Sequence, residues 1–228
     1  MHMKELQVGA ELRRVRLEKK LSLRSVATAV GVSASLLSQV ETGKTQPSVS
    51  TLYALVNHLG LSLDGIMSGQ GAVSDTASSS SPSNSVVQRG ADNPRIDMEN
   101  GVTWERLAHG SSNIADPLLV TYPPGSSSSL EGKLMRHEAA EYGYLLQGKL
   151  LLKLEFETIE INAGDSFSFD ANRPHLYRNE SNETVKGIWF VISTHDAKYD
   201  QPTERLAADH SAASAVDVLR MMNQRNGQ

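Results

Sequence analysis

Cysteine is absent from this chain of 228 residues, which excludes disulfides, thiolate metal sites and cysteine nucleophiles. No run of eighteen apolar residues occurs, so a transmembrane helix is excluded. The first twenty residues lack the apolar segment that a secretory signal needs, and we therefore expect a cytoplasmic protein. Hydrophobic residues make up 39% and charged residues 21% of the chain, as in ordinary globular proteins, and the length suffices for two modest domains.

The net charge of −4 hides an asymmetry along the chain. Residues 1–68 carry eight Lys and Arg against five Asp and Glu, whereas the rest of the chain carries 14 against 21. A basic segment joined to an acidic one indicates a part that binds a polyanion. The alternative is a solvated helix face, because five of the eight cations lie within residues 13–20. Charge alone does not choose between these two interpretations.

A serine-rich segment lies between the two parts. Eight of the 18 residues in 68–85 are serine, and such a stretch cannot bury enough apolar surface to offset its ordering entropy. We therefore predict a flexible linker over residues 69–85, with one domain over 1–68 and another over 86–195. A C-terminal extension follows over 196–228, and its apolar spacing favours a helix.

The first part has the periodicity and capping residues of five short helices. Ser22 and Ser33 are suitable N-caps, while Gly31, Gly43 and Gly60 are suitable helix ends. The predicted helices cover about residues 4–19, 23–30 and 34–42, a fourth that Pro47 and Ser48 open and that stops at Gly60, and a fifth over 62–67. Two short helices joined by a tight Gly-Val-Ser turn form a helix-turn-helix unit.

Residues 21–43, followed by Pro47-Ser-Val-Ser-Thr-Leu52, resemble the Xre-type (lambda-repressor-like) helix-turn-helix family. The resemblance covers about residues 4–67 and implies that the third helix lies in the major groove of DNA. It also implies an internal ion pair between Arg16 and Glu41. The DNA-binding residues that it implies are Arg24, Ser33, Ala34, Ser35, Ser38, Gln39 and Lys44. Gln39 is the strongest candidate for base recognition, because its amide can form a bidentate pair with adenine.

Beyond residue 85 the apolar pattern has a period of two, which is typical of strands. The predicted strands are 86–87, 102–107, 118–122, 133–137, 142–146, 149–154, 158–161, 166–169, 175–177 and 185–192. Many short strands at this spacing predict a double-sheet barrel of the jelly-roll kind. The fold class is therefore multidomain, an α domain followed by an all-β domain.

His137, Glu141 and His175 are candidate metal ligands. Two imidazoles and one carboxylate form a facial set that holds a divalent metal and leaves coordination positions open. The spacing of His137 and Glu141 allows both side chains to lie on one face of an extended segment. From spacing alone, scattered surface histidines are an equal alternative.

Two longer motifs resemble those of the cupin family: His137-Glu-Ala-Ala-Glu141-Tyr-Gly-Tyr-Leu-Leu-Gln-Gly148, and residues 164–179 around His175. The resemblance implies a divalent metal on His137, Glu141 and His175, Zn first, with Mn, Fe or Ni as alternatives. Met135 stands where the family usually has a further histidine, and a thioether suits Cu(I) rather than these ions. We therefore expect Met135, together with Tyr177, to line a ligand pocket. The alternative is a metal-free cluster of hydrogen-bonded polar residues.

A helix-turn-helix domain joined to a single cupin domain resembles a class of bacterial transcriptional regulators. The resemblance implies a homodimer that binds a double-stranded DNA operator and senses a small-molecule effector, such as an amino or carboxylic acid. It implies a protein that is not an enzyme and does not bind membranes. The alternatives are a metal-dependent cupin oxygenase or isomerase fused to a DNA-binding domain, and a DNA-binding antitoxin or nucleoid protein without an effector.

Overall fold

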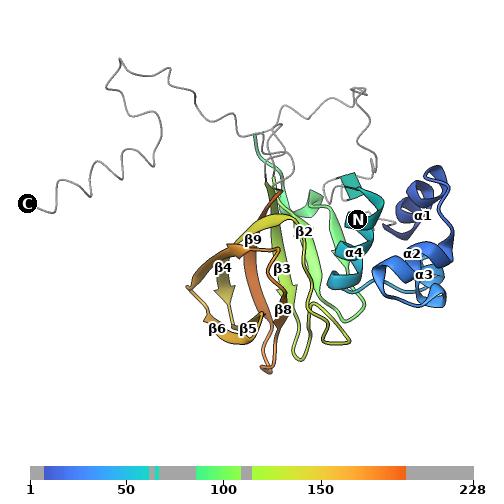
Figure 1. Ribbon diagram of the computed structural model, residues 1–228. Coiled ribbons are helices and arrows are strands. Elements are labelled where there is room, and N and C mark those ends of the chain that lie inside the picture. Colours follow the sequence, from blue (N-terminus) through green and yellow to red (C-terminus); the bar gives the residue numbers. More distant parts are fainter. Residues whose placement is uncertain (1–7, 62–64, 67–85, 109–114, 194–228) are drawn as a thin grey trace, which may run out of the picture. The chain divides into compact units, whose positions relative to one another are not determined.

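The computed structural model describes residues 8–61, 65–66, 86–108 and 115–193 (Figure 1). Within these ranges, four α-helices precede nine β-strands. The helices are α1 (Val8–Glu18), α2 (Leu23–Val30), α3 (Ala34–Glu41) and α4 (Val49–Leu59), and a 3-10 turn, η1 (Gly90–Asp92), precedes the first strand. None of the described helices is long and apolar enough to span a bilayer. The observed order of elements confirms the α plus all-β class.

Serine side chains fix where three of the helices begin. Ser22, Ser33 and Ser48 each accept a hydrogen bond from the backbone N–H three residues further on. Two of these helices, α2 and α4, end at Gly31 and Gly60, which adopt the left-handed conformation that glycine reaches without a steric penalty. The bounds predicted for the second helix are thereby confirmed.

The β-strands form two antiparallel sheets. The larger sheet has the order β1-β2-β3-β9-β4-β7 and the smaller one β6-β5-β8. The strands are β1 (Arg95–Asp97), β2 (Thr103–Arg106), β3 (Asp116–Tyr122), β4 (Ala139–Gln147), β5 (Lys149–Leu154), β6 (Glu157–Asn162), β7 (Ser166–Asp170), β8 (His175–Arg178) and β9 (Val185–Ser193). Buried side chains alternate along β3, β4 and β5, as expected where one face of each sheet packs on a shared core. This arrangement confirms the predicted double-sheet jelly roll.

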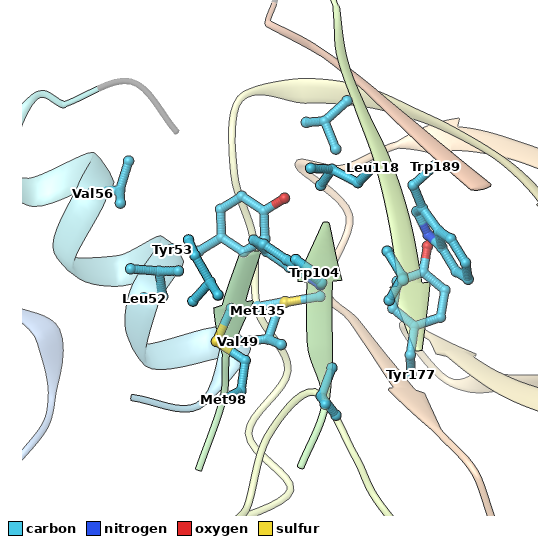
Figure 2. Close-up of a cluster of buried hydrophobic side chains, with 14 of the residues drawn as sticks. Val49, Leu52, Tyr53, Val56, Met98, Trp104, Leu118, Met135, Tyr177 and Trp189 are labelled. Carbon is cyan, nitrogen blue, oxygen red and sulfur yellow. The ribbon is translucent and has the colours of Figure 1, made fainter. Parts of the chain in front are cut away.

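Helix α4 contacts the β-barrel directly. The backbone N–H of Ser50 donates to the carbonyl of Ser128 at 2.9 Å, and the N–H of Glu99 donates to the carbonyl of Pro47 at 3.2 Å. Its side chains join those of the strands in one cluster of buried hydrophobic residues (Figure 2). The helical segment and the barrel therefore share packed surface at this helix.

Two of the predicted strands are wrong. Residues 86–87 form no strand, and the Val86 side chain is almost fully exposed, so no burial favours pairing there. The segment 133–137 contributes only an isolated bridge, in which Met135 pairs with His175. Strand β1 was not predicted, because only its central residue, Ile96, is buried.

Other predicted segments lie partly or wholly outside the described residues. The fifth helix, predicted over 62–67, is described only at residues 65–66, and both are helical. The predicted linker over 69–85 and the predicted extension over 196–228 lie outside the described residues.

Candidate metal centre and nucleic-acid interface

Three elements of the barrel bring His137, Glu141 and His175 together. His137 lies two residues before β4, and its backbone N–H donates to the carbonyl of Ala171; Glu141 lies within β4, and His175 begins β8. All three side chains are buried, and one ligand atom from each lies within 4.8 Å of the others. Of the two interpretations that spacing alone left open, scattered surface histidines are therefore excluded.

The hydrogen bonds of His175 leave one of its nitrogens without a partner. Its Nδ1 lies 2.8 Å from the carbonyl oxygen of Arg173, which can only accept, so Nδ1 carries the proton. Its Nε2 faces the centre of the triad, 3.4 Å from the Glu141 carboxylate. Nε2 is fully buried and has no hydrogen-bond partner. A buried acceptor without a partner costs free energy unless something binds it.

Glu141 is the electrostatic centre of the triad. Its Oε1 lies 2.7 Å from His137 Nε2, and its Oε2 accepts a 2.6 Å hydrogen bond from the Tyr177 hydroxyl. Burial alone would raise the pKa of Glu141, but interactions with His137 and His175 outweigh it and lower that pKa to about 2. Burial and the charge of Glu141 raise the pKa of Tyr177 well above its usual value, so Tyr177 stays a proton donor.

These residues fit a divalent metal ion. Two imidazole nitrogens and a carboxylate oxygen are the donor set of a facial site, and the unpaired Nε2 of His175 is oriented as a ligand should be. The Nδ1 contact to the Arg173 carbonyl is the outer hydrogen bond that metal-bound histidines generally make. The triad can therefore hold a metal, and its chemistry does not identify which one.

A small cavity of about 20 Å³ adjoins Glu141. Both pocket residues predicted from the sequence, Met135 and Tyr177, line it. The other lining residues are Val49, Tyr53, Trp104, Leu118, Val120, Tyr122, Trp189 and Val191. Sequence reasoning missed Tyr53, Trp104 and Trp189; the alternation of β2 and β9 marks the tryptophans as inward-facing, whereas no pattern in α4 predicts that Tyr53 enters the barrel.

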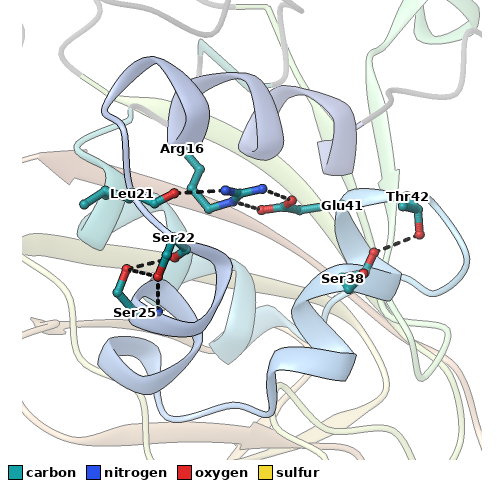
Figure 3. A network of polar contacts seen from close by, with 7 residues as sticks. All are labelled: Arg16, Leu21, Ser22, Ser25, Ser38, Glu41 and Thr42. Atoms are coloured by element: carbon teal, nitrogen blue, oxygen red, sulfur yellow. Dashed lines mark hydrogen bonds and ion pairs between the residues drawn. The ribbon is translucent and has the colours of Figure 1, made fainter.

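In the helical part, a buried ion pair joins α1 to α3 (Figure 3). Arg16 donates from Nε and Nη2 to the two carboxylate oxygens of Glu41, at 2.6 and 2.7 Å, and from Nη1 to the Leu21 carbonyl at 2.9 Å. The close approach of the two helices depends on Gly9, where a Cβ would collide with the Val40 carbonyl. The ion pair implied by the family resemblance is present. Its two residues are among the charged residues of segment 1–68.

The candidate DNA-binding residues lie around α2 and α3. Ser35 and Gln39 are exposed and one helical turn apart, and the Gln39 amide donates to the Ser35 hydroxyl at 3.2 Å. Ala34 is half-buried, and the Ser33 hydroxyl caps the helix. The remaining candidates are all exposed: Arg24, Ser38 and Lys44.

The fold and the site define a two-part class of protein. Residues 7–66 match a family model described as a helix-turn-helix domain, and residues 118–191 match one described as a cupin domain. The chain therefore combines a helix-turn-helix domain with a cupin domain.

Particular relatives share both parts. The chain is 27% identical over 191 residues to the HTH-type transcriptional regulator PuuR of Escherichia coli (strain K12), which covers 83% of this chain and 95% of that protein. It is 23% identical over 179 residues to the HTH-type transcriptional regulator SutR of the same organism, covering 78% and 90%. A crystal structure of an HTH_3 family transcriptional regulator from Vibrio cholerae has the same fold, with a TM-score of 0.57, 19% identity, and coverage of 82% and 95%.

Proposed function

We propose that this chain is a sequence-specific, DNA-binding transcriptional regulator whose cupin domain senses a small molecule. The observation that carries the proposal is the presence, in a chain with a helix-turn-helix domain, of a buried triad whose His175 Nε2 lacks a partner. The relatives named as HTH-type transcriptional regulators, which span both domains, support it. We further propose that the protein works in the cytoplasm as a homodimer on a palindromic operator, with half-sites about one helical turn apart.

DNA recognition is assigned to α3 and its flanks. Ala34, Ser35 and Gln39 are assigned to base edges: Ala34 and Ser35 lie in the first turn of this helix, and Gln39 lies one turn after Ser35 on the exposed side. The residues assigned to the phosphates are Arg24, Ser33, Ser38 and Lys44.

Sensing is assigned to the triad and the cavity beside it. His137 Nε2, the Glu141 carboxylate and His175 Nε2 would hold a divalent ion, Zn first and Mn, Fe or Ni otherwise. Such an ion supplies a Lewis-acidic centre with open positions for a chelating group. A small amino or carboxylic acid is the proposed effector class, and Tyr177 keeps Glu141 oriented by its hydrogen bond.

We assign the cupin domain to sensing rather than catalysis. Among the described residues that line the cavity, Glu141 is the only carboxylate, and it is already engaged by His137 and Tyr177. No separate acid–base pair is thus available there. Turnover of a thiol, amino-acid or sugar substrate in air with added Fe(II) would contradict this assignment and favour a cupin oxygenase or isomerase.

Selection of binding sites from random duplex DNA with the full chain tests the DNA-binding half. We expect an enriched palindromic motif, relaxed at one position by Gln39→Ala through the loss of a base contact. Lys44→Ala should instead weaken binding to all sequences alike and reduce the salt slope by about one unit. Equal losses on the selected and random duplexes for both variants would contradict the assignment.

A further inference from the structure

The side chain of Tyr53, which belongs to the helix-turn-helix domain, is packed inside the cupin barrel. Its ring stacks on the candidate metal ligand His137, with centroids 4.1 Å apart and planes 5° apart. The Trp104 ring meets it edge-on, with centroids 5.4 Å apart (Figure 2). Only 6% of Tyr53 is exposed. The DNA-binding domain thus contacts the triad through one aromatic ring.

This ring leaves little room beside the triad. The cavity that Tyr53 lines together with Glu141 measures about 20 Å³, which is space for roughly one water molecule. A metabolite with several non-hydrogen atoms cannot enter while the ring stays in place. If the cupin domain senses such a molecule, as proposed above, the sensing state must differ from this one at Tyr53.

A second, larger cavity also has Tyr53 in its lining. It measures about 300 Å³, within the range of small-molecule sites, and is formed by α4, the start of α3 and residues 129–136. Tyr53 and Met135 line both cavities. These two residues therefore lie between the larger cavity (the outer cleft) and the small cavity beside Glu141.

We propose that Tyr53 is a gate that the effector must displace, so that effector binding and the docking of α4 on the barrel exclude each other. The effector enters through the outer cleft, and a flat, largely apolar part of it takes the place of the Tyr53 ring between His137 and Trp104. This inference rests on the proposed function, because it assigns the route and the competitor of the same effector.

Among the described residues, few polar contacts join the helical domain to the barrel. Besides the two backbone hydrogen bonds described above, Lys133 Nζ donates to the Gly31 carbonyl at 3.1 Å, and this contact is exposed. Because α4 packs against α1 and α2, a shift of α4 moves the helices that carry α3. The coupling cannot exceed the difference in effector affinity between the docked and released arrangements.

The test uses p-cresol, which is the tyrosine side chain as a free molecule, with the full-length chain and its Tyr53→Ala variant. The two tryptophans of the sequence, Trp104 and Trp189, both line the inner cavity, so their fluorescence reports its occupancy. We expect p-cresol to bind Tyr53→Ala at least about tenfold more tightly than the wild type, and to raise the melting temperature of the variant alone. Tyr144→Ala is the matched control, because Tyr144 is an exposed tyrosine on β4, and it should behave as the wild type.

A second readout measures the docking itself. The chain lacks cysteine, so spin labels on Thr28→Cys in α2 and Lys153→Cys in β5, both exposed, report one distance between the domains. We expect a single narrow distance in the Tyr53-containing protein and a broader distribution in Tyr53→Ala with p-cresol. Equal p-cresol binding by wild type and variant, no binding by the folded variant, or an unchanged distance would each overturn the proposal.

Tyr53→Leu replaces Tyr53→Ala if circular dichroism finds the alanine variant unfolded, with the same outcomes for and against. Neither readout requires DNA or a metal ion. A negative result with p-cresol therefore contradicts the Tyr53 proposal and not the proposed function. Failure of the chain to select a DNA motif contradicts the proposed function and says nothing about p-cresol binding.

Discussion

Two buried carboxylates, Glu41 and Glu141, differ in whether the polar groups around them all have hydrogen-bond partners. Glu41 receives both of its hydrogen bonds from Arg16, which also donates to the Leu21 carbonyl. Around Glu141, His137 and Tyr177 bond the two oxygens, yet His175 contributes a buried nitrogen that makes no hydrogen bond. We call the Arg16–Glu41 pair closed, because its polar atoms bond one another, and the group around Glu141 open, because His175 Nε2 makes no hydrogen bond. A closed group stabilises a fold, whereas an open one has a position for a ligand.

Breaking the Arg16–Glu41 ion pair should have the largest effect on the free energy of unfolding. Glu41→Ala leaves the Arg16 guanidinium buried without its carboxylate, and we expect a loss of about 3–5 kcal/mol in the free energy of unfolding. Chemical denaturation monitored by circular dichroism measures it. A loss below about 1 kcal/mol would mean that water reaches Arg16 and that the pair is not closed.

Binding of a divalent ion to the open group around Glu141 should have the next largest effect on stability. A divalent ion that binds only the folded triad stabilises the protein by about 2.7 kcal/mol at one hundred times its dissociation constant. Thermal unfolding with and without Zn²⁺ measures this, and His137→Ala should abolish the gain. An equal rise in melting temperature for the variant would place the ion elsewhere.

A further metal-ligating side chain in the open group should have a smaller effect, measured as the affinity for Zn²⁺. Met135 is buried beside the triad and pairs with His175 through its backbone, so Met135→His adds an imidazole near the centre. We expect about tenfold tighter Zn²⁺ binding, or ~1.4 kcal/mol, by isothermal titration. Leu134→His, on the neighbouring residue of the outer cleft, is the control, and tightening by both variants would contradict a specific fourth ligand.

The exposed ion pairs of α1 should matter least. Arg14 bonds Glu11 and Glu18 at the helix surface, where solvent screens the charges. Arg14→Ala should therefore cost less than about 1 kcal/mol in the same denaturation experiment. A cost near that of Glu41→Ala would remove the distinction between buried and exposed pairs.

The features that were predictable from the sequence are those set by local chemistry. Ser22, Ser33 and Gly31 bound the helices because caps act within one turn, and the strand over 149–154 follows from its alternation. The segment 133–137 was also predicted as a strand but makes only one bridge, because pairing depends on a partner strand that sequence does not specify.

The candidate site was predictable in part. His137, Glu141 and His175 are found through two motifs, each local in sequence. Tyr53 could not be found in this way, because its place inside the barrel depends on docking between two domains. The unpaired state of the His175 nitrogen likewise depends on the Arg173 carbonyl and can be seen only in three dimensions.

Metal analysis of protein purified without chelators tests the central claim, that the open group around Glu141 binds an ion, most directly. By mass spectrometry of the elements, we predict about one divalent ion per chain in the wild type and almost none in His175→Ala. Equal metal contents in the two proteins would contradict the account.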